Sequence, residues 1–300
     1  HQMLEAGINY IDTARGYTVS EEFLGYALEG IRDKFVIATK SMSRTKEDMA
    51  RDVEISLKNL RTNYIDLYQV HNVPPSQMAQ ICAPGGALEA LLEAKAAGKI
   101  GHIGLTAHST ETFKMALDMD WVETFMFPYN IVENQGEDTI AKCAEKNIGF
   151  IAMKPLAGGN IEDATLAMKY ILANPNCTIA IPGMGDAGEV YQNAAAADAE
   201  GLTDADKAAC EKIVDALGKN FCRRCGYCAP CPKGINIPSN FLFANYLRHY
   251  GLADWAKSRY FSMDKTAKDC VGCGTCETRC PYELPIREML KKVAMDMGEA

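Results

Sequence analysis

The feature that most constrains this chain is a repeated alternation of short apolar runs and longer amphipathic segments over its first two thirds. The runs are nearly continuous in hydrophobic, β-branched or aromatic residues, as in parallel strands that are covered on both faces. The segments between them, such as residues 46–61 and 86–99, carry apolar residues at helical spacing. The seven runs are residues 8–12, 35–39, 64–70, 102–106, 123–127, 149–153 and 178–182.

Seven strand–helix units predict either an open doubly wound sheet or an eight-stranded (β/α)8 barrel. No GxGxxG follows a strand to begin a dinucleotide-binding sheet. The first residue is His1 rather than Met, which predicts a chain that lacks its natural start. We therefore expect an α/β fold, a (β/α)8 barrel over residues 1–213 whose first strand is missing. In such a barrel the active site lies at the carboxyl ends of the strands.

Composition limits the partners of this chain. Its 300 residues are 48% hydrophobic, which is enough to bury a large core. The net charge of -8 and the scattered basic residues argue against a nucleic acid or an anionic membrane as partner. No apolar run reaches the roughly 18 to 20 residues that span a bilayer. These features predict a soluble cytoplasmic protein.

After residue 213 the pattern changes to helical segments that surround clustered cysteines. Residues 214–300 are therefore expected to form a second, mostly helical domain, small enough to need a metal for stability. Of the 12 cysteines in the chain, eight lie in these clusters. The other four, scattered through the chain, are interpreted as small buried hydrophobic residues. They are Cys82, Cys143, Cys177 and Cys210.

The clustered cysteines have the spacing of ferredoxin-type iron–sulfur ligands, in which three cysteines bind one cluster and a fourth, followed by proline, reaches a second. We assign Cys222, Cys225, Cys228 and Cys280 to one [4Fe-4S] cluster. The second takes Cys270, Cys273, Cys276 and Cys231. The gap before Cys231 is one residue shorter than the pattern, which keeps a single cluster as an alternative. Structural zinc is the other alternative, since zinc also takes four thiolates.

Polar residues follow the first predicted strands in an arrangement suited to acid catalysis. Asp12, Lys40 and His71 end three strands, and Tyr17 lies in the loop after Asp12. An ammonium beside a tyrosine lowers its pKa from about 10. Lys40 is expected to do this for Tyr17, with Asp12 holding the lysine and His71 binding a carbonyl oxygen. Tyr17 would then deliver a proton during carbonyl reduction by hydride transfer.

GINYIDTARGY and SEEFLGYAL, followed by ATK, YQVH, GKIGHIGLT and IPGMG, resemble the aldo/keto reductase family over residues 1 to about 200. The resemblance implies a (β/α)8 barrel that uses an Asp, Tyr, Lys and His tetrad with a nicotinamide cofactor. MKPLAGG resembles the subgroup that carries a C-terminal [4Fe-4S] dicluster domain. The catalytic tetrad implied by the resemblance falls on Asp12, Tyr17, Lys40 and His71.

The positions that resemble nicotinamide-binding residues depart from the family pattern. Thr106 and Ala107 stand where the family usually has Ser and Asn, and Met126 replaces the usual Gln. Thr106 can still form a hydrogen bond to the carboxamide. The usual stacking Tyr is replaced by Met153 or Lys154. Either these substitutions re-pack the same cofactor, or Lys154 contacts a phosphate or an acidic group of the substrate.

Near the last strand, IPGMGDAGEVYQN resembles the segment that binds the adenosine end of the cofactor. Gln192 and Asn193 fall on the adenine-contacting positions. Gly185 and Asp186 stand where Ser and a basic residue would receive a 2'-phosphate. A carboxylate there repels that phosphate, so NAD(P)H is expected as cofactor with NADH favoured.

The sequence therefore predicts an oxidoreductase that reduces an aldehyde or ketone and carries two [4Fe-4S] clusters. In this interpretation the clusters stabilise their domain or bind a partner. In the alternative, the clusters carry electrons between an electron-transfer partner protein and a barrel that does not use nicotinamide. A redox sensor or adaptor built on a retired barrel is a further alternative, against which the intact tetrad counts.

Overall fold

The computed structural model describes residues 1–199, 201–217 and 220–299. A parallel sheet of seven strands in chain order forms its centre. The strands are β1 (Tyr10–Asp12), β2 (Val36–Ser41), β3 (Ile65–Val70), β4 (Ile100–Thr106), β5 (Thr124–Pro128), β6 (Gly149–Met153) and β7 (Ile179–Ile181). Each overlaps a run that the sequence predicts, because a strand buried on both faces is a continuous apolar run.

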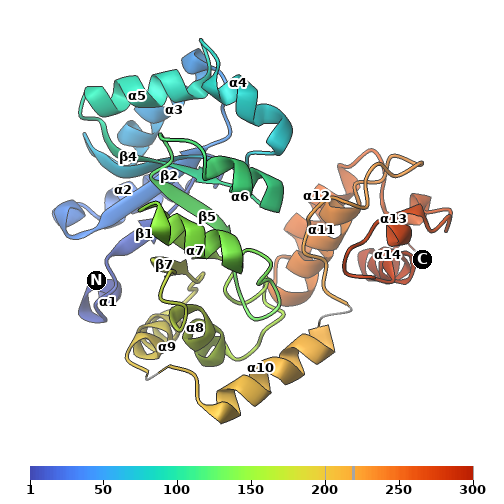
Figure 1. Ribbon diagram of the computed structural model, residues 1–300. Coiled ribbons are helices and arrows are strands. Elements are labelled where there is room, and N and C mark those ends of the chain that lie inside the picture. Colours follow the sequence, from blue (N-terminus) through green and yellow to red (C-terminus); the bar gives the residue numbers. More distant parts are fainter. Residues whose placement is uncertain (200, 218–219, 300) are drawn as a thin grey trace.

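Helices connect the strands and cover the outside of the sheet (Figure 1). These helices are α1 (Gln2–Glu5), α2 (Ser20–Ala27), α3 (Lys46–Asn59), α4 (Met78–Cys82), α5 (Ala87–Ala96), α6 (Thr110–Ala116), α7 (Glu137–Glu145), α8 (Ala164–Leu172) and α9 (Ala187–Ala197), with short 3-10 turns η1 (Arg32–Lys34) and η2 (Pro75–Gln77). This is the predicted (β/α)8 barrel architecture with seven strands observed. Among the described residues β1 and β7 do not pair with each other.

Side chains alternate between the two faces of the sheet. Ile37 belongs to the large core between the strands and the outer helices. Its neighbour Ala38 belongs to a smaller cluster with Leu67, Met126 and Ile151. Successive residues of a strand point to opposite faces, so this smaller cluster fills the inner side of the sheet. The interior is thus packed, and only the strand ends are left for chemistry.

Helix α10 (Asp204–Leu217) joins the barrel to a helical lobe (Figure 1). The lobe contains α11 (Ile237–His249), α12 (Ala253–Phe261), η3 (Ala267–Asp269), α13 (Thr275–Thr278) and α14 (Ile286–Met297). It has its own core, in which Phe241, Tyr260 and Leu290 pack with buried cysteines. Residue 213 lies within α10, and the division of the chain at residues 213 and 214 stays a prediction.

The lobe packs against the loop that follows β6. Gly159 has a φ of +81°, and a Cβ there would lie 2.8 Å from the Cβ of His249 in α11. Gly158 similarly lies against Asn245 and the Tyr250 hydroxyl. The close approach therefore requires glycine at position 159. It brings α11 to the end of the barrel at which the strands finish.

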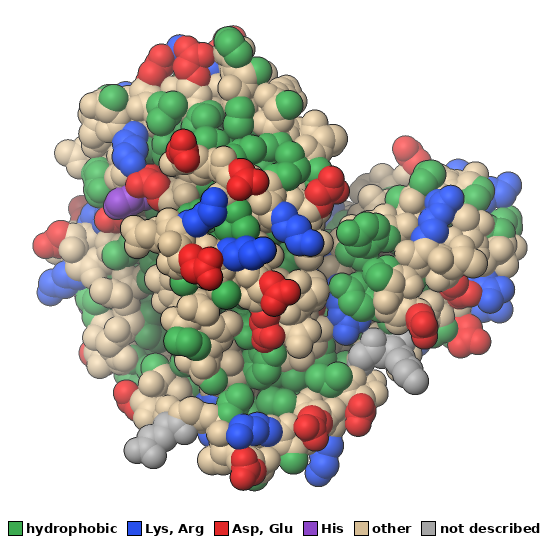
Figure 2. Space-filling model, in the orientation of Figure 1, with side chains coloured by type: hydrophobic (Ala, Val, Ile, Leu, Met, Phe, Trp, Pro, Cys, Tyr) green, Lys and Arg blue, Asp and Glu red, His purple; other side chains and the backbone are tan. Residues whose placement is uncertain are grey.

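The face shown in Figure 2 carries basic and acidic side chains that are interspersed over both the barrel and the lobe. No helix in the described part of the chain is long and apolar enough to cross a membrane. The scattered cysteines differ from one another. Cys143 and Cys210 are buried and Cys177 is partly buried, but Cys82 is exposed. The prediction for Cys82 was wrong because α4 buries Met78 and Ile81 instead.

Candidate functional site

The structure brings the four predicted catalytic residues together at the carboxyl ends of β1, β2 and β3. Asp12 ends β1, Lys40 lies one residue before the end of β2, and His71 follows β3. Ladder-like backbone bonds continue past the strands, with Arg15 N donating to Lys40 O at 2.9 Å and His71 N to Ser41 O at 2.8 Å. These bonds fix the loops that carry the site.

Lys40 and Asp12 form a buried ion pair. Lys40 Nζ lies 2.5 Å from Asp12 Oδ2 and donates to Thr13 O at 2.8 Å, and its side chain is 2% exposed. Burial raises the pKa of Asp12 and lowers the pKa of Lys40, because both charges are removed from water, while each charge stabilises the other. The lysine is thus held in one place by two acceptors.

Tyr17 lies over this pair. Lys40 Nζ is 5.1 Å from the centroid of the Tyr17 ring. The Tyr17 and His71 rings meet edge to face at a centroid distance of 6.1 Å. Burial raises the pKa of Tyr17, and Asp12 and Tyr246 raise it further. The expected net lowering of the Tyr17 pKa was wrong, because burial, the largest cause, and the Asp12 carboxylate that pairs with Lys40 both raise that pKa. Tyr17 is therefore a fully protonated phenol near neutral pH.

His71 is a neutral imidazole. Burial lowers its pKa to about 4, and the charges of Lys40 and Arg44 act in the same direction. Arg44 Nη2 donates to the His71 carbonyl oxygen at 2.7 Å, which anchors the backbone of the residue. A neutral imidazole keeps one N–H with which to donate to a carbonyl oxygen.

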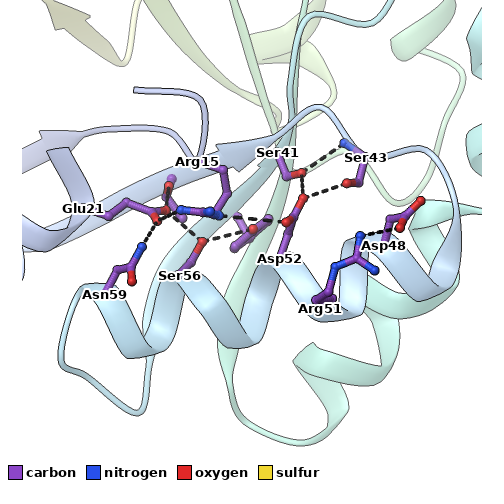
Figure 3. A network of polar contacts seen from close by, with 11 residues as sticks. Arg15, Glu21, Ser41, Ser43, Asp48, Arg51, Asp52, Ser56 and Asn59 are labelled. Carbon is purple, nitrogen blue, oxygen red and sulfur yellow. Dashed lines mark hydrogen bonds and ion pairs between the residues drawn. The ribbon is translucent and has the colours of Figure 1, made fainter. Parts of the chain in front are cut away.

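A polar network beneath the site fixes the loop between Asp12 and Tyr17 (Figure 3). Arg15 Nη1 lies 2.7 Å from Glu21 Oε2. Glu21 is 1% exposed and also accepts from Thr39, Ser56 and Asn59. Sequence reasoning did not select Glu21 or Arg15. The one signal was SEEF itself, in which a charged residue occupies an inward position of a helix.

The positions predicted to hold the nicotinamide lie around the end of β4. Thr106 is 2% exposed, and its hydroxyl oxygen accepts from Asn72 N at 2.8 Å. Its proton remains able to donate to a ligand. Ala107 and Met126 are buried and carry no hydrogen-bonding group. His108, which follows them, has an Nδ1 without a partner among the described residues.

At the proposed adenosine end, the side chains are partly engaged within the protein. Asn193 is 8% exposed and donates to Glu189 O at 2.8 Å, and Gln192 donates to Thr165 at 3.4 Å. Asp186 caps α9 by accepting from Glu189 N at 3.0 Å. Glu189 Oε2 in turn accepts from Gly185 N at 2.5 Å. Two carboxylates therefore surround this helix terminus.

Lys154, directly after β6, meets the first cysteine segment of the lobe. Burial lowers the pKa of Lys154 to about 7, and Arg224 lowers it further, opposed by Glu133 and Cys222. Arg224 Nη2 lies 3.7 Å from Glu133 Oε1. Arg223 Nε donates to Val132 O at 2.9 Å and thereby ties the same segment to the barrel. Residues between two predicted cluster ligands thus reach the end of the barrel, which the sequence gave no means of foreseeing.

The eight clustered cysteines line two separate cavities. One is lined by Cys222, Cys225, Cys228 and Cys280. The other is lined by Cys231, Cys270, Cys273 and Cys276. Each set combines three cysteines of one segment with the last cysteine of the other. Within the described ranges, no three His, Cys, Asp or Glu side chains converge closely enough to hold a single metal ion. The thiols present fit [4Fe-4S] ligation, and each cavity is lined by one of the two sets of four cysteines predicted from the spacing.

Comparisons with known proteins match both the barrel and the lobe. The Aldo/keto reductase family model matches residues 1–165, and a 4Fe-4S dicluster domain model matches residues 221–285. The aldo-keto reductase YhdN of Bacillus subtilis is 35% identical over 158 residues, which are 48% of this chain and 46% of that protein. The chain thus spans about half the length of this curated relative.

Solved aldo-keto reductases share the barrel. The holo form of AKR11C1 from Bacillus halodurans superposes with a TM-score of 0.63 at 25% identity, covering 71% of this chain and 84% of that chain. An aldo-keto reductase from Klebsiella pneumoniae, solved in complex with NADPH, gives 0.61 at 27% identity and covers 71% and 82%. Taken with the strand order and the cysteine segments, these matches show that the chain is an oxidoreductase-type member of the aldo/keto reductase family that carries a 4Fe-4S dicluster domain.

Proposed function

We propose that this protein reduces the carbonyl group of an aldehyde or ketone, with Tyr17 as proton donor, and that its lobe holds two [4Fe-4S] clusters. The observation that carries this proposal is the buried Asp12–Lys40 pair, 2.5 Å apart, under the ring of Tyr17 and beside a neutral His71. When bound, NAD(P)H supplies the hydride. The chain itself supplies the proton and the groups that orient the carbonyl.

The residues divide this work between them. His71 donates a hydrogen bond to the carbonyl oxygen and holds it beside Tyr17. As the oxygen becomes an alkoxide, it is a stronger base than the phenolate, so Tyr17 gives up its proton even with a raised pKa. Lys40 stabilises the phenolate that remains, and Asp12 keeps the ammonium in position. The proton of Tyr17 is then replaced from solvent, since the ring is 46% exposed.

Negative charge at the proposed adenosine end supports NADH over NADPH as the cofactor. Asp186 and Glu189 place two carboxylates at the helix terminus where the resemblance puts the adenosine ribose. A 2'-phosphate there would meet negative charge. We expect NADH to bind with the lower dissociation constant when the two nucleotides are titrated against the protein.

A second candidate function is electron transfer through the clusters to a barrel that does not use nicotinamide. It is favoured by the hydrogen bond of Arg223 Nε to Val132 O at 2.9 Å, which holds the segment that begins at Cys222 against the barrel. It is also favoured by Ala107 and Met126, which offer no hydrogen bond to a carboxamide. Anaerobic titration with NADH and NADPH separates the two. Failure of the reconstituted protein to bind either nucleotide would favour the second candidate.

The test of the proposed function is Tyr17→Phe, which removes only the phenolic oxygen. Loss of one proton donor is expected to lower kcat by about two to four orders of magnitude. Iron and sulfide content should stay unchanged, because Tyr17 is not among the predicted cluster ligands and its ring meets Lys40 and His71 of the barrel. Tyr26→Phe is the matched control, since Tyr26 is 67% exposed on α2. Equal activity of the two variants would refute the role of Tyr17.

A further inference from the structure

Two cations and one carboxylate lie together where the lobe meets the end of the barrel. Lys154 comes from the loop after β6, Arg224 from the first cysteine segment, and Glu133 from the loop after β5. Asn130 Nδ2 joins them by donating to both Lys154 O and Glu133 Oε2 at 2.9 Å. The group carries one net positive charge when both cations are protonated.

The polar atoms of this group are buried without being satisfied. The Arg224 side chain is 10% exposed and that of Glu133 is 0% exposed. Arg224 Nε and Nη2, Glu133 Oε1 and His108 Nδ1 have no hydrogen-bond partner within the part of the chain that the structure describes. The 3.7 Å separation of Arg224 and Glu133 is too long for a hydrogen bond. A buried guanidinium with free donors requires an acceptor, and within the described residues the Glu133 carboxylate beside it lies beyond hydrogen-bond distance.

The group lies next to the tetrad. The tetrad lies at the ends of β1, β2 and β3, and Glu133 and Lys154 follow β5 and β6 of the same parallel sheet. Tyr246 and Tyr250 of the lobe pack on each other at a ring distance of 5.2 Å, and the Tyr250 hydroxyl lies against Gly158 in the loop that carries Lys154. Because the carboxyl ends of parallel strands lie at one end of a barrel, the tetrad and the cation group bound the same end, and one small molecule can meet both.

We propose that Lys154 and Arg224 form an anion site that selects carbonyl substrates bearing a carboxylate, so that the physiological substrates are oxo acids. Arg224 offers the fork of donors that matches a carboxylate, and Lys154 adds charge. Glu133 reduces the net charge to that of one monoanion. This inference rests on the proposed function, because it assigns the carboxylate of the same molecule whose carbonyl meets Tyr17 and His71.

The experiment compares a series of oxo carboxylates of increasing chain length with their neutral methyl esters, using the cluster-loaded protein. We expect at least one acid to be reduced with a kcat/KM tenfold or more above that of its ester. Lys154→Met and Arg224→Gln should each remove this preference by lowering kcat/KM for the acid, with kcat/KM for the ester little changed. Arg224→Lys should restore part of the preference. Arg51→Gln, which removes a surface guanidinium that is 59% exposed, is the matched control.

Three results would overturn the proposal. The first is that no acid is preferred over its ester. The second is that the preference survives in both variants. The third is that the variants weaken nucleotide binding tenfold while the ratio of acid to ester stays constant, since the anion site would then serve the phosphates of the cofactor. Lys154→Met lies outside the cysteine segments, so it keeps the test decisive if Arg224→Gln loses iron.

A binding measurement separates this inference from the proposed function. Trp255 packs on Tyr246 at 5.2 Å and therefore reports on this end of the barrel by its fluorescence. Benzoate should change that fluorescence in the parent protein and not in Lys154→Met, even if no carbonyl compound is reduced. Reduction without benzoate binding would leave the proposed function standing and remove the anion site.

Discussion

At the scale of residues, the site depends on how charges are neutralised in pairs. Lys40 is balanced by Asp12, and Glu21 by Arg15, so that each buried charge has a partner. Arg224 and Glu133, 3.7 Å apart, have no hydrogen bond to each other. The sequence predicted the tetrad because its members follow strands in regular order. It did not predict that Asp12 would raise the pKa of Tyr17, which depends on the side-chain positions.

Breaking the Asp12–Lys40 pair from one side should destabilise the protein. Lys40→Met leaves the Asp12 carboxylate, 11% exposed, without a counter-charge, which typically costs about 3–5 kcal/mol in the free energy of unfolding. Asp12→Asn combined with Lys40→Met should recover most of this loss without recovering activity. Denaturant unfolding of both variants measures the change in the free energy of unfolding, and Lys207→Met, which breaks the exposed pair with Asp204, is the control. A double variant no more stable than Lys40→Met would contradict the ion-pair account.

The neutrality of His71 predicts the pH dependence of both activity and stability. With a folded pKa of about 4, His71 keeps its neutral form across pH 5.5 to 8, so kcat/KM should show no inflection near 6.5 from this residue. The unfolded chain binds the proton first as pH falls, so the contribution of His71 to stability is present above about 6.5 and is lost as pH falls towards 4. His71→Gln should remove that loss. An inflection near 6.5 that disappears in His71→Gln would refute the neutral state.

At the scale of elements, the two cysteine segments are interdependent. The sequence predicted the exchange of the fourth ligands from spacing alone, and the cavities combine the cysteines in that way. The docking of α11 on the loop after β6 was not predicted. It depends on the absence of a side chain at Gly159 and on contacts between residues about 90 positions apart in the chain, for which a single sequence carries no signal.

Replacing the last cysteine of either segment by serine tests this pairing of ligands. Cys280→Ser should disrupt the cluster of the first segment, and Cys231→Ser the cluster of the second, because each residue completes the opposite set. Iron content should fall from about eight to about four atoms per chain in either variant, and the spectra of the two remaining clusters should differ. Cys82→Ser, at an exposed cysteine outside both sets, is the control. The pairing would be wrong if each variant lost the cluster of its own segment.

At the scale of the whole molecule, an aldo/keto reductase barrel and a 4Fe-4S dicluster lobe meet at the strand ends. The barrel was predictable because seven nearly continuous apolar runs, separated by helical segments, indicate buried parallel strands. The arrangement of the two halves was not, because it is set by side chains such as Arg223, Arg224 and His249 that follow no periodic pattern. Because the two halves meet at this end of the barrel, the two proposed functions differ in the route of the reducing electrons, which is the central question.

The measurement that tests hydride transfer most directly is the fate of deuterium. The cluster-loaded protein is given a carbonyl substrate and NADH or NADPH with deuterium on the transferred position, and the alcohol is analysed by mass spectrometry. Hydride transfer at the tetrad predicts one deuterium on the carbinol carbon, at a rate that falls in Tyr17→Phe. An alcohol that carries hydrogen from solvent at that carbon, formed at a rate unchanged in Tyr17→Phe, would contradict the account and would favour transfer of the nucleotide's electrons through the clusters.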